Sequence, residues 1–271
     1  MAPGIDRDGR QGDGAAGSGK RDRGDPERSV FGRLLKGGGE VAFGLSDADP
    51  NEYDRPMFDG MCDWLQLDFS QMRVLDVGCW NAQLAVYLGE HFDGIEYVGL
   101  DFSLEALRVS RLAGPNVHTV MADVGESLPC ADESFDTVFY MQTFEHLQRG
   151  QDRASLHRLR AILKPGGHLV FGTQINSLPN FLDPAWYFGH RHYWPRHLRE
   201  MLQEAGLEVR SELTNGGFWQ MADVNLLYVW KHILRRKYRT PEWLRRLALR
   251  EHRPKSPLTS TRVWFHCVRP G

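Results

Sequence analysis

The chain has no long hydrophobic run and few cysteines. Its 271 residues are 41% hydrophobic and 25% charged, as in ordinary globular proteins, and no run of about 18 apolar residues could cross a bilayer. The four cysteines form no CxxC pair and have no histidine at metal spacing, so neither a disulfide framework nor a metal site is expected. The N-terminal stretch lacks the apolar segment of a secretory signal. We therefore expect a cytoplasmic protein.

Residues 1–29 lack aromatic side chains, and Met1 and Ile5 are their only large aliphatic-type side chains. Such a stretch buries too little apolar surface to offset the entropy of ordering, so we predict a disordered leader. Its six acidic and six basic residues balance, which argues against a basic arm for nucleic acid. Farther along, the segment from Lys231 to the C-terminus carries twelve Lys or Arg against two acids, although the whole chain has a net charge of −2. That asymmetry favours anionic partners for the C-terminal part.

Residues 30–271 are predicted to form one domain. Tyr53, Met57, Met61 and Trp64 recur at spacings of three and four, which predicts an amphipathic helix within a helical cap over residues 30–70. From Arg73 onward, short runs rich in Val, Phe and Tyr alternate with helical patterns, which is typical of a parallel sheet with helices on both faces. The expected strands lie at residues 73–77, 96–101, 117–123, 135–141, 168–173, 207–213 and 262–268. An insertion over residues 216–261 separates the last two.

A glycine turn follows the first of these strands. In VLDVGCWNAQLA, residues 74–85, a buried strand runs into Gly78 and a helix begins a few residues later. Backbone N–H groups and a helix N-terminus then face any ligand above the turn, and glycine allows close approach. Asp101 ends the next strand, 23 residues after Gly78, where a carboxylate can accept both hydroxyls of a ribose. Asp123 ends the third strand, where it can accept a hydrogen bond from an adenine amino group.

The motifs occur in a recognisable order. VLDVGC, the acidic Asp101, ADVGESLPCADESFDTVF, the triplet EHL and LKPGGHLVF resemble class I S-adenosylmethionine-dependent methyltransferases of the small-molecule, type 11-like group, over about residues 70–175. The resemblance implies an α/β, Rossmann-like, doubly wound sheet of seven strands whose last strand is antiparallel. It implies S-adenosylmethionine as the cofactor. The residues that it places at the cofactor are Asp76, Gly78, Cys79, Trp80, Asp101, Phe102, Ala122, Asp123, Val124 and Gln142.

Two features qualify that resemblance. An NAD-binding Rossmann enzyme would need GxGxxG, whereas this loop continues from Gly78 as Cys-Trp-Asn-Ala. The methyltransferase family usually has glycine where Trp80 and Ala82 stand, which puts cofactor affinity in question. We hypothesise that Trp80 contacts the cofactor; packing against nearby loops is the alternative.

The KPGG turn at residues 164–167 is expected to end a helix before the fifth strand.

Methyl transfer is an in-line displacement that requires alignment, and a base helps when the acceptor is a hydroxyl. His146, in the EHL triplet after the fourth strand, is the candidate base; a purely structural role in the loop is the alternative. The substrate-binding candidates are Tyr53, His190, His192, Tyr193 and Trp219. No metal is expected at the histidines, since no Cys or carboxylate stands at a convincing spacing.

The insertion is rich in Trp, Leu and Arg. An amphipathic basic helix over residues 218–239 can rest on an anionic membrane or bind a lipid-like acceptor. A lid that excludes water from the site is the favoured interpretation. The predicted function is methyl transfer to a small-molecule or lipid-like acceptor, with O-methylation preferred. A non-methylating protein of this fold is the alternative, and a nucleic-acid methyltransferase is disfavoured because residues 142–145 read Gln-Thr-Phe-Glu where an NPPY-type tetrad would stand.

Overall fold

The computed structural model describes residues 54–236 and 238–271, without the side chains of residues 54, 187 and 188. The predicted leader, the first part of the predicted cap and Tyr53 lie outside the described residues. The described elements are α2 (Asp54–Leu65), β1 (Arg73–Val77), α3 (Gln83–His91), β2 (Glu96–Asp101), α4 (Leu104–Ser110), η3 (Arg111–Ala113), β3 (Val117–Met121), β4 (Phe135–Met141), η4 (Phe144–His146), α5 (Asp152–Ile162), β5 (Leu163–Gln174), η5 (Pro179–Leu182), η6 (Pro184–Phe188), α6 (Pro195–Glu204), β6 (Glu208–Asn215), α7 (Phe218–Tyr228), the π-helical η7 (Val229–Ile233), α8 (Glu242–Arg250) and β7 (Arg262–Val268).

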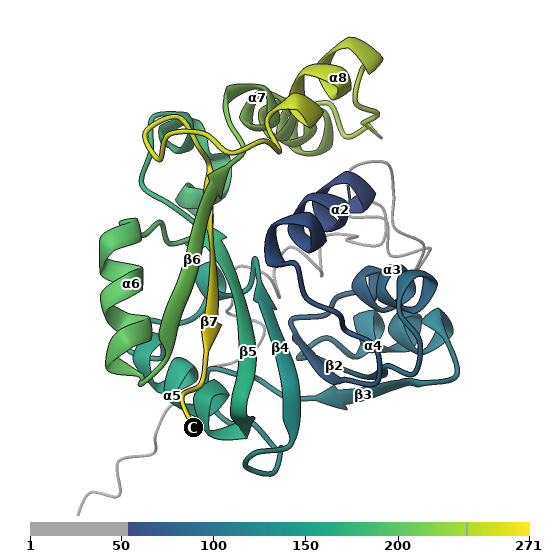
Figure 1. The fold of residues 1–271 in the computed structure, drawn as a ribbon. Helices are drawn as coiled ribbons and strands as arrows, with labels where there is room; N and C mark the ends of the chain where they lie inside the picture. Colours follow the sequence, from purple (N-terminus) through teal and green to yellow (C-terminus); the bar gives the residue numbers. More distant parts are fainter. Residues whose placement is uncertain (1–53, 237) are drawn as a thin grey trace, which may run out of the picture.

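The strands form one seven-stranded sheet in the order β3-β2-β1-β4-β5-β7-β6 (Figure 1). Neighbouring strands from β3 to β5 pair in parallel, whereas β7 lies antiparallel between β5 and β6. The predicted seven-stranded, doubly wound sheet with an antiparallel last strand is confirmed. Strands β1, β2 and β3 follow one another toward one edge of the sheet, and the chain then returns to place β4 on the other side of β1. Ligands of open α/β sheets bind at the carboxyl ends of strands beside such a reversal.

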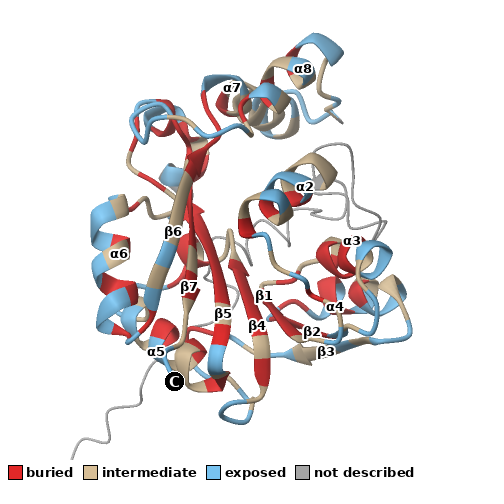
Figure 2. Cartoon of the chain, viewed as in Figure 1, coloured by how far each residue is buried: buried red, intermediate tan, exposed pale blue. Residues whose placement is uncertain are grey.

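Each face of the sheet has its own hydrophobic core (Figure 2). In β4, Val138 and Tyr140 pack with α5 and α6, while Phe139 between them packs with α2 and α3. Successive side chains of a strand point to opposite faces, so a strand buried on both sides needs a continuous apolar run. Both faces are covered in this way, which explains why Val and Phe crowd these strands and leaves the ends of the strands to carry polar groups.

The insertion between β6 and β7 contributes α7, η7 and α8. Helix α7 packs against α8 and against η5 and η6, which follow β5 (Figure 1). Its first backbone N–H groups are capped from outside the helix, because the buried carboxylate of Glu251 accepts hydrogen bonds from Trp219 and Gln220, both at 3.0 Å. No helix in the described part of the chain is long and apolar enough to span a bilayer.

The KPGG segment differs from its prediction. Helix α5 ends at Ile162, β5 begins at Leu163, and the β4–β5 register shifts between Phe135 and Thr137. Residues 164–167 therefore form an irregular stretch within β5 and not a glycine turn that ends the helix. The reason is long-range pairing: Gly166 donates to the carbonyl of Arg269 at the end of the chain, and Arg269 donates to Gly167.

Candidate active site

The turn after β1 requires glycine at its first position. Gly78 has φ +77°, and a Cβ there would lie 2.0 Å from Oγ1 of Thr143, which follows β4. Thr143 is itself held in place, since its hydroxyl donates to the carbonyls of Val77 and Met141. The backbone N–H of Gly78 donates to Leu100 in β2 at 2.7 Å. The turn thus packs tightly between the ends of β2 and β4, which only a residue without a side chain permits.

Trp80 and Ala82 take the backbone conformation that glycine usually supplies. Their φ angles are +49° and +57°, in the left-handed region, which costs roughly 1–2 kcal/mol for an L-residue. Trp80 is held there because its N–H donates to Asp101 at 3.1 Å and its carbonyl accepts from Ser110 at 2.6 Å. The methyl group of Ala82 is fully buried in the core. Trp80 and Ala82 therefore place strain in the loop.

The carboxylate of Asp101 joins this loop to the end of β2. It is buried and accepts hydrogen bonds from the N–H groups of Trp80 and Ser103, at 3.1 and 2.8 Å. Burial raises the pKa of Asp101, and those hydrogen bonds oppose the rise. The N–H of Ala122 donates to the carbonyl of Asp101, which brings the end of β3 alongside. There Asp123 is exposed and accepts from Gly125 at 2.8 Å.

Asp76 and Cys79, at the end of β1 and in the turn after it, are both buried. The hydroxyl of Tyr97, in β2, donates to Asp76 at 2.5 Å, and burial raises the pKa of Asp76 to about 7. Burial also raises the pKa of the Cys79 thiol, whose sulfur lies 3.8 Å from the Ser110 hydroxyl, so this thiol is not a reactive nucleophile. The pairing of Asp76 with Tyr97 was not predicted, although both belong to expected neighbouring strands.

Gln142 joins the end of β4 to the neighbouring strand β5. It follows β4 with φ +50°, and its N–H donates to Gly172 in β5 at 2.8 Å. Its side-chain oxygen accepts from Gln174 at 2.8 Å. Its Nε2 is buried and has no hydrogen-bond partner. A buried amide nitrogen without a partner is costly, and a ligand oxygen at this position would satisfy it.

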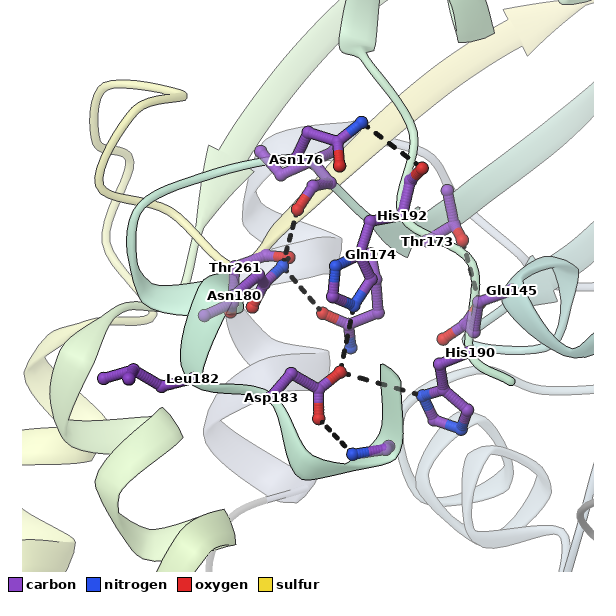
Figure 3. Close-up of polar contacts among 12 residues, drawn as sticks. Glu145, Thr173, Gln174, Asn176, Asn180, Leu182, Asp183, His190, His192 and Thr261 are labelled. Atoms are coloured by element: carbon purple, nitrogen blue, oxygen red, sulfur yellow. Dashed lines mark hydrogen bonds and ion pairs between the residues drawn. The ribbon is translucent and has the colours of Figure 1, made fainter. Parts of the chain in front are cut away.

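The structure also brings together the three predicted histidines, of which His190 and His192 are labelled in Figure 3. The rings of His146 and His190 meet edge-on with centroids 4.3 Å apart. Nε2 of His192 lies 2.9 Å from Asp183, and Nδ1 of His190 lies 4.0 Å from the same carboxylate. Asp183 was missed from the sequence, where the only signal is an Asp before a proline that starts a helical turn. The described residues contain no group of His, Cys, Asp or Glu suited to hold a metal ion.

Glu145 and His146 are both buried enough to disfavour charge. Glu145 accepts a hydrogen bond from the Thr173 hydroxyl at 2.8 Å, and burial raises its pKa to about 7. Burial lowers the pKa of His146 to about 3. A histidine in that environment is neutral at physiological pH, yet it holds a transferred proton weakly.

The remaining predicted substrate residues fall in two places. Tyr193 packs in the core against Phe144, with its hydroxyl 3.4 Å from Asp152, so its position suits packing. Trp219 is 44% exposed on α7 and contacts Trp243 of α8 edge-on. It helps to line an apolar cavity of about 350 Å³, whose other lining residues are Leu182, Phe218, Ala222 and Asn225. One of these lining residues, Leu182, directly precedes Asp183 in the chain.

Comparison with known proteins identifies the fold's family. A profile described as a methyltransferase domain matches residues 74–167. The chain thus carries a region similar to a methyltransferase domain, within a sheet of the class I methyltransferase fold. It is similar to ubiquinone biosynthesis O-methyltransferase of Alkalilimnicola ehrlichii, 32% identical over 114 residues, which cover 41% of this chain and 44% of that protein. It is also similar to fatty-acid O-methyltransferase of Mycolicibacterium smegmatis, 29% identical over 147 residues, or 52% and 50% of the two chains. The chain spans about half the length of these curated relatives.

Solved structures share the fold of the methyltransferase domain at low identity. The [4+2]-cyclase SpnF superimposes with a TM-score of 0.62 and 17% identity over 89% of this chain and 96% of that one. Phosphoethanolamine N-methyltransferase 2 of Haemonchus contortus, in complex with S-adenosyl-L-methionine, gives 0.61 and 17%, over 91% and 59%. The resemblance deduced from the motifs is confirmed by these comparisons, which at this identity concern the fold.

Proposed function

We propose that this protein transfers a methyl group from S-adenosylmethionine to a small-molecule or lipid-like acceptor, with oxygen as the preferred acceptor atom. The observation that carries the proposal is the continuity of the site. The Gly78 turn packs against Thr143, and the adjacent Gln142 accepts a hydrogen bond from Gln174. Figure 3 shows Gln174 beside Asp183 and its histidines. The relatives described as O-methyltransferases of ubiquinone biosynthesis and of fatty acids support the choice of acceptor.

The residues at the strand ends fit the cofactor. The Gly78 turn approaches without a side chain, and Nε2 of Gln142 needs an acceptor that a bound ligand would supply. In this proposal Asp76 and Gly78 hold the methionine part, Asp101 the ribose and Asp123 the adenine. When bound, the cofactor supplies an electrophilic methyl group on a sulfonium. The protein's residues orient the acceptor against it and exclude water, for which we propose residues 216–261 as the lid.

Replacing Asp101 with alanine tests the cofactor site. We expect the variant to lose at least about 100-fold in affinity for S-adenosylmethionine. The reason is that the two ribose hydroxyls would lose the charged carboxylate to which they are proposed to donate hydrogen bonds. Calorimetric titration with S-adenosylmethionine and its demethylated product measures this. Asp132→Ala, at an exposed loop aspartate, is the matched control and should bind like the parent. A parent that binds neither compound would overturn the proposal.

A non-methylating role for the same fold is the second candidate. It is favoured by the strained Trp80 and Ala82 positions, and by the likeness to a structure described as a [4+2]-cyclase. Consumption of S-adenosylmethionine with phenolic and fatty-acid acceptors distinguishes the two functions. Binding without consumption would favour the second. Trp80 also reports cofactor contact, since titration should change tryptophan fluorescence in the parent more than in Trp80→Phe.

We further propose peripheral membrane contact through residues 218–239, and a cytoplasmic location. Within this segment Val229, Trp230, Ile233 and Leu234 are exposed, with Ile233 at 72%. Exposed Arg235 follows them directly. Apolar side chains beside arginine suit the interface of an anionic bilayer.

Sedimentation with vesicles tests this contact. The parent should bind vesicles that contain phosphatidylglycerol at low salt, and Ile233→Asp should lose at least about tenfold in affinity. Leu112→Asp is the matched control, because Leu112 is an 81% exposed leucine on η3 and its replacement should leave binding unchanged. Equal binding by Ile233→Asp and the parent would exclude this surface.

A further inference from the structure

Asp183 is a buried carboxylate at the centre of the histidine cluster (Figure 3). It is 4% exposed and stands at the start of η6, where one oxygen accepts from the N–H of Ala185 at 2.9 Å. Its other oxygen lies 2.9 Å from Nε2 of His192 and 4.0 Å from Nδ1 of His190. Burial alone would raise the pKa of Asp183, yet the contacts with His192, Ala185 and His190 hold it below its ordinary value. Asp183 is therefore an anion inside the cluster.

The two histidines beside Asp183 differ in access. The side chain of His192 is 6% exposed, whereas that of His190 is 21% exposed. With Nδ1 of His190 turned toward the carboxylate, Nε2 is left on the opposite edge of the ring. No hydrogen bond joins that atom to another described residue. His190 is thus the member of the pair that a small molecule can reach.

The charges around the cluster favour His190 over His146 as a holder of a proton. At His190, burial lowers the pKa, Asp183 raises it and His192 lowers it. At His146, burial and His190 together lower the pKa to about 3, against a smaller effect of Asp183. Asp183 also raises the pKa of Glu145 and, across the cluster, of Tyr228 in α7. Helix α7 is tied to the same place, since Asn225 donates to the carbonyl of Leu182 at 2.9 Å.

We propose that Asp183 is a positioning residue that holds His190 to accept the proton of a hydroxyl acceptor, an inference that rests on the proposed methyl transfer. The acceptor's O–H bond breaks and its proton moves to Nε2 of His190. The oxygen's electron pair forms the new bond to the methyl carbon of the sulfonium donor, and the carbon–sulfur bond breaks to leave a neutral thioether. Asp183 balances the positive charge on His190, which returns the proton to water. His146 packs against His190 and helps to fix its ring.

The first experiment needs no acceptor. Titration of the histidine rings by NMR in the full chain should show a lower pKa for His190 in Asp183→Asn than in the parent, because removal of the carboxylate disfavours the imidazolium. Asparagine can still accept from Ala185, so the turn should survive, and the melting temperature checks this. Asp152→Asn is the matched control: it removes the partner of neighbouring Arg191 and should leave His190 unchanged. An unchanged His190 in Asp183→Asn would overturn the proposal.

The second experiment compares acceptors that differ in their need for a base. With 3,4-dihydroxybenzoate, methylated at a phenol, Asp183→Asn and His190→Gln should lose about 10- to 100-fold in kcat. The acid limb of kcat/KM in Asp183→Asn should move to lower pH. With dodecanoate, which is already ionised, kcat should change little. Equal losses with both acceptors, or a parent that methylates dodecanoate alone, would overturn the base role. A parent that binds S-adenosylmethionine and methylates neither would overturn the proposed function, while the NMR titration still decides the position of Asp183.

Discussion

Gly78→Ala is expected to lower the free energy of unfolding by about 2–4 kcal/mol and to remove measurable binding of S-adenosylmethionine. The added Cβ would lie 2.0 Å from Oγ1 and 3.0 Å from Cβ of Thr143, so a rotation of the Thr143 side chain cannot relieve the whole clash. At φ +77° the alanine would also be strained in open space. The turn would have to move, and with it the N–H groups that face the proposed cofactor.

Gly89→Ala supplies the matched control. Gly89 lies in α3, the helix that follows this turn, and a Cβ there meets nothing within 4 Å. The change should stabilise the protein by roughly 0.5–1 kcal/mol, since alanine loses less entropy in a helix. Urea denaturation measures both variants, and calorimetry measures cofactor affinity. If Gly78→Ala unfolds and binds like the parent, the turn does not form the close-packed cradle described here.

Asp76→Asn is expected to stabilise the protein above neutral pH while weakening its binding of the cofactor. The pKa of Asp76 is raised to about 7 from an ordinary 3.8, so the folded state disfavours the ionised form. The contribution of protonated Asp76 to the free energy of unfolding is complete below about pH 4, and it is lost as the pH rises through about 7. Asparagine, which cannot ionise, should therefore gain on the order of 2 kcal/mol over the parent at pH 8, and the gain should shrink toward pH 4.

The binding arm of the same experiment has the opposite sign. In the proposed role beside the methionine part, an ionised Asp76 favours the positive charges of the ligand, so Asp76→Asn should lose about 10- to 100-fold in affinity at pH 8. Asp136→Asn is a control for the stability arm, because Lys164 lies 2.8 Å from Asp136 and the pKa of Asp136 is lowered. That variant should be less stable than the parent near neutral pH, with the difference vanishing on acidification. A stability gain in Asp76→Asn that is the same at pH 5 and pH 8 would contradict the buried charge.

Much of the fold was predictable because it depends on short-range patterns. The seven strands lie close to their expected positions. The inner strands β1, β2, β4, β5 and β7 carry apolar runs buried on both faces of the sheet, which made them the clearest. In the insertion, the helix expected over residues 218–239 is found as α7 and η7, which end at Ile233, whereas α8 was not predicted. The KPGG segment was not predicted either, because its course is set by pairing with Arg269, more than a hundred residues later.

Less of the site was predictable. His146, His190 and His192 were found by their place after β4 and β5, since the carboxyl ends of parallel strands meet at one edge. Asp183 belongs to no recognisable sequence motif. Its role comes from contacts with His190 and His192, 7 and 9 residues farther along the chain, which the loop brings back beside it. Tyr193 follows the same strand, yet the register of the loop turns it into the core.

The sequence by itself determined the order of strands and helices, the glycine turn and the acidic strand ends, because these depend on period, propensity and position along the chain. Only the tertiary structure decided which of those groups keep their charge. Three features follow from burial and from neighbours distant in sequence: the left-handed backbone of Trp80, the buried amide nitrogen of Gln142 that has no hydrogen-bond partner, and the anionic Asp183 between two histidines. Desolvation acts on the folded surroundings of a group, so no local pattern of residues can specify it.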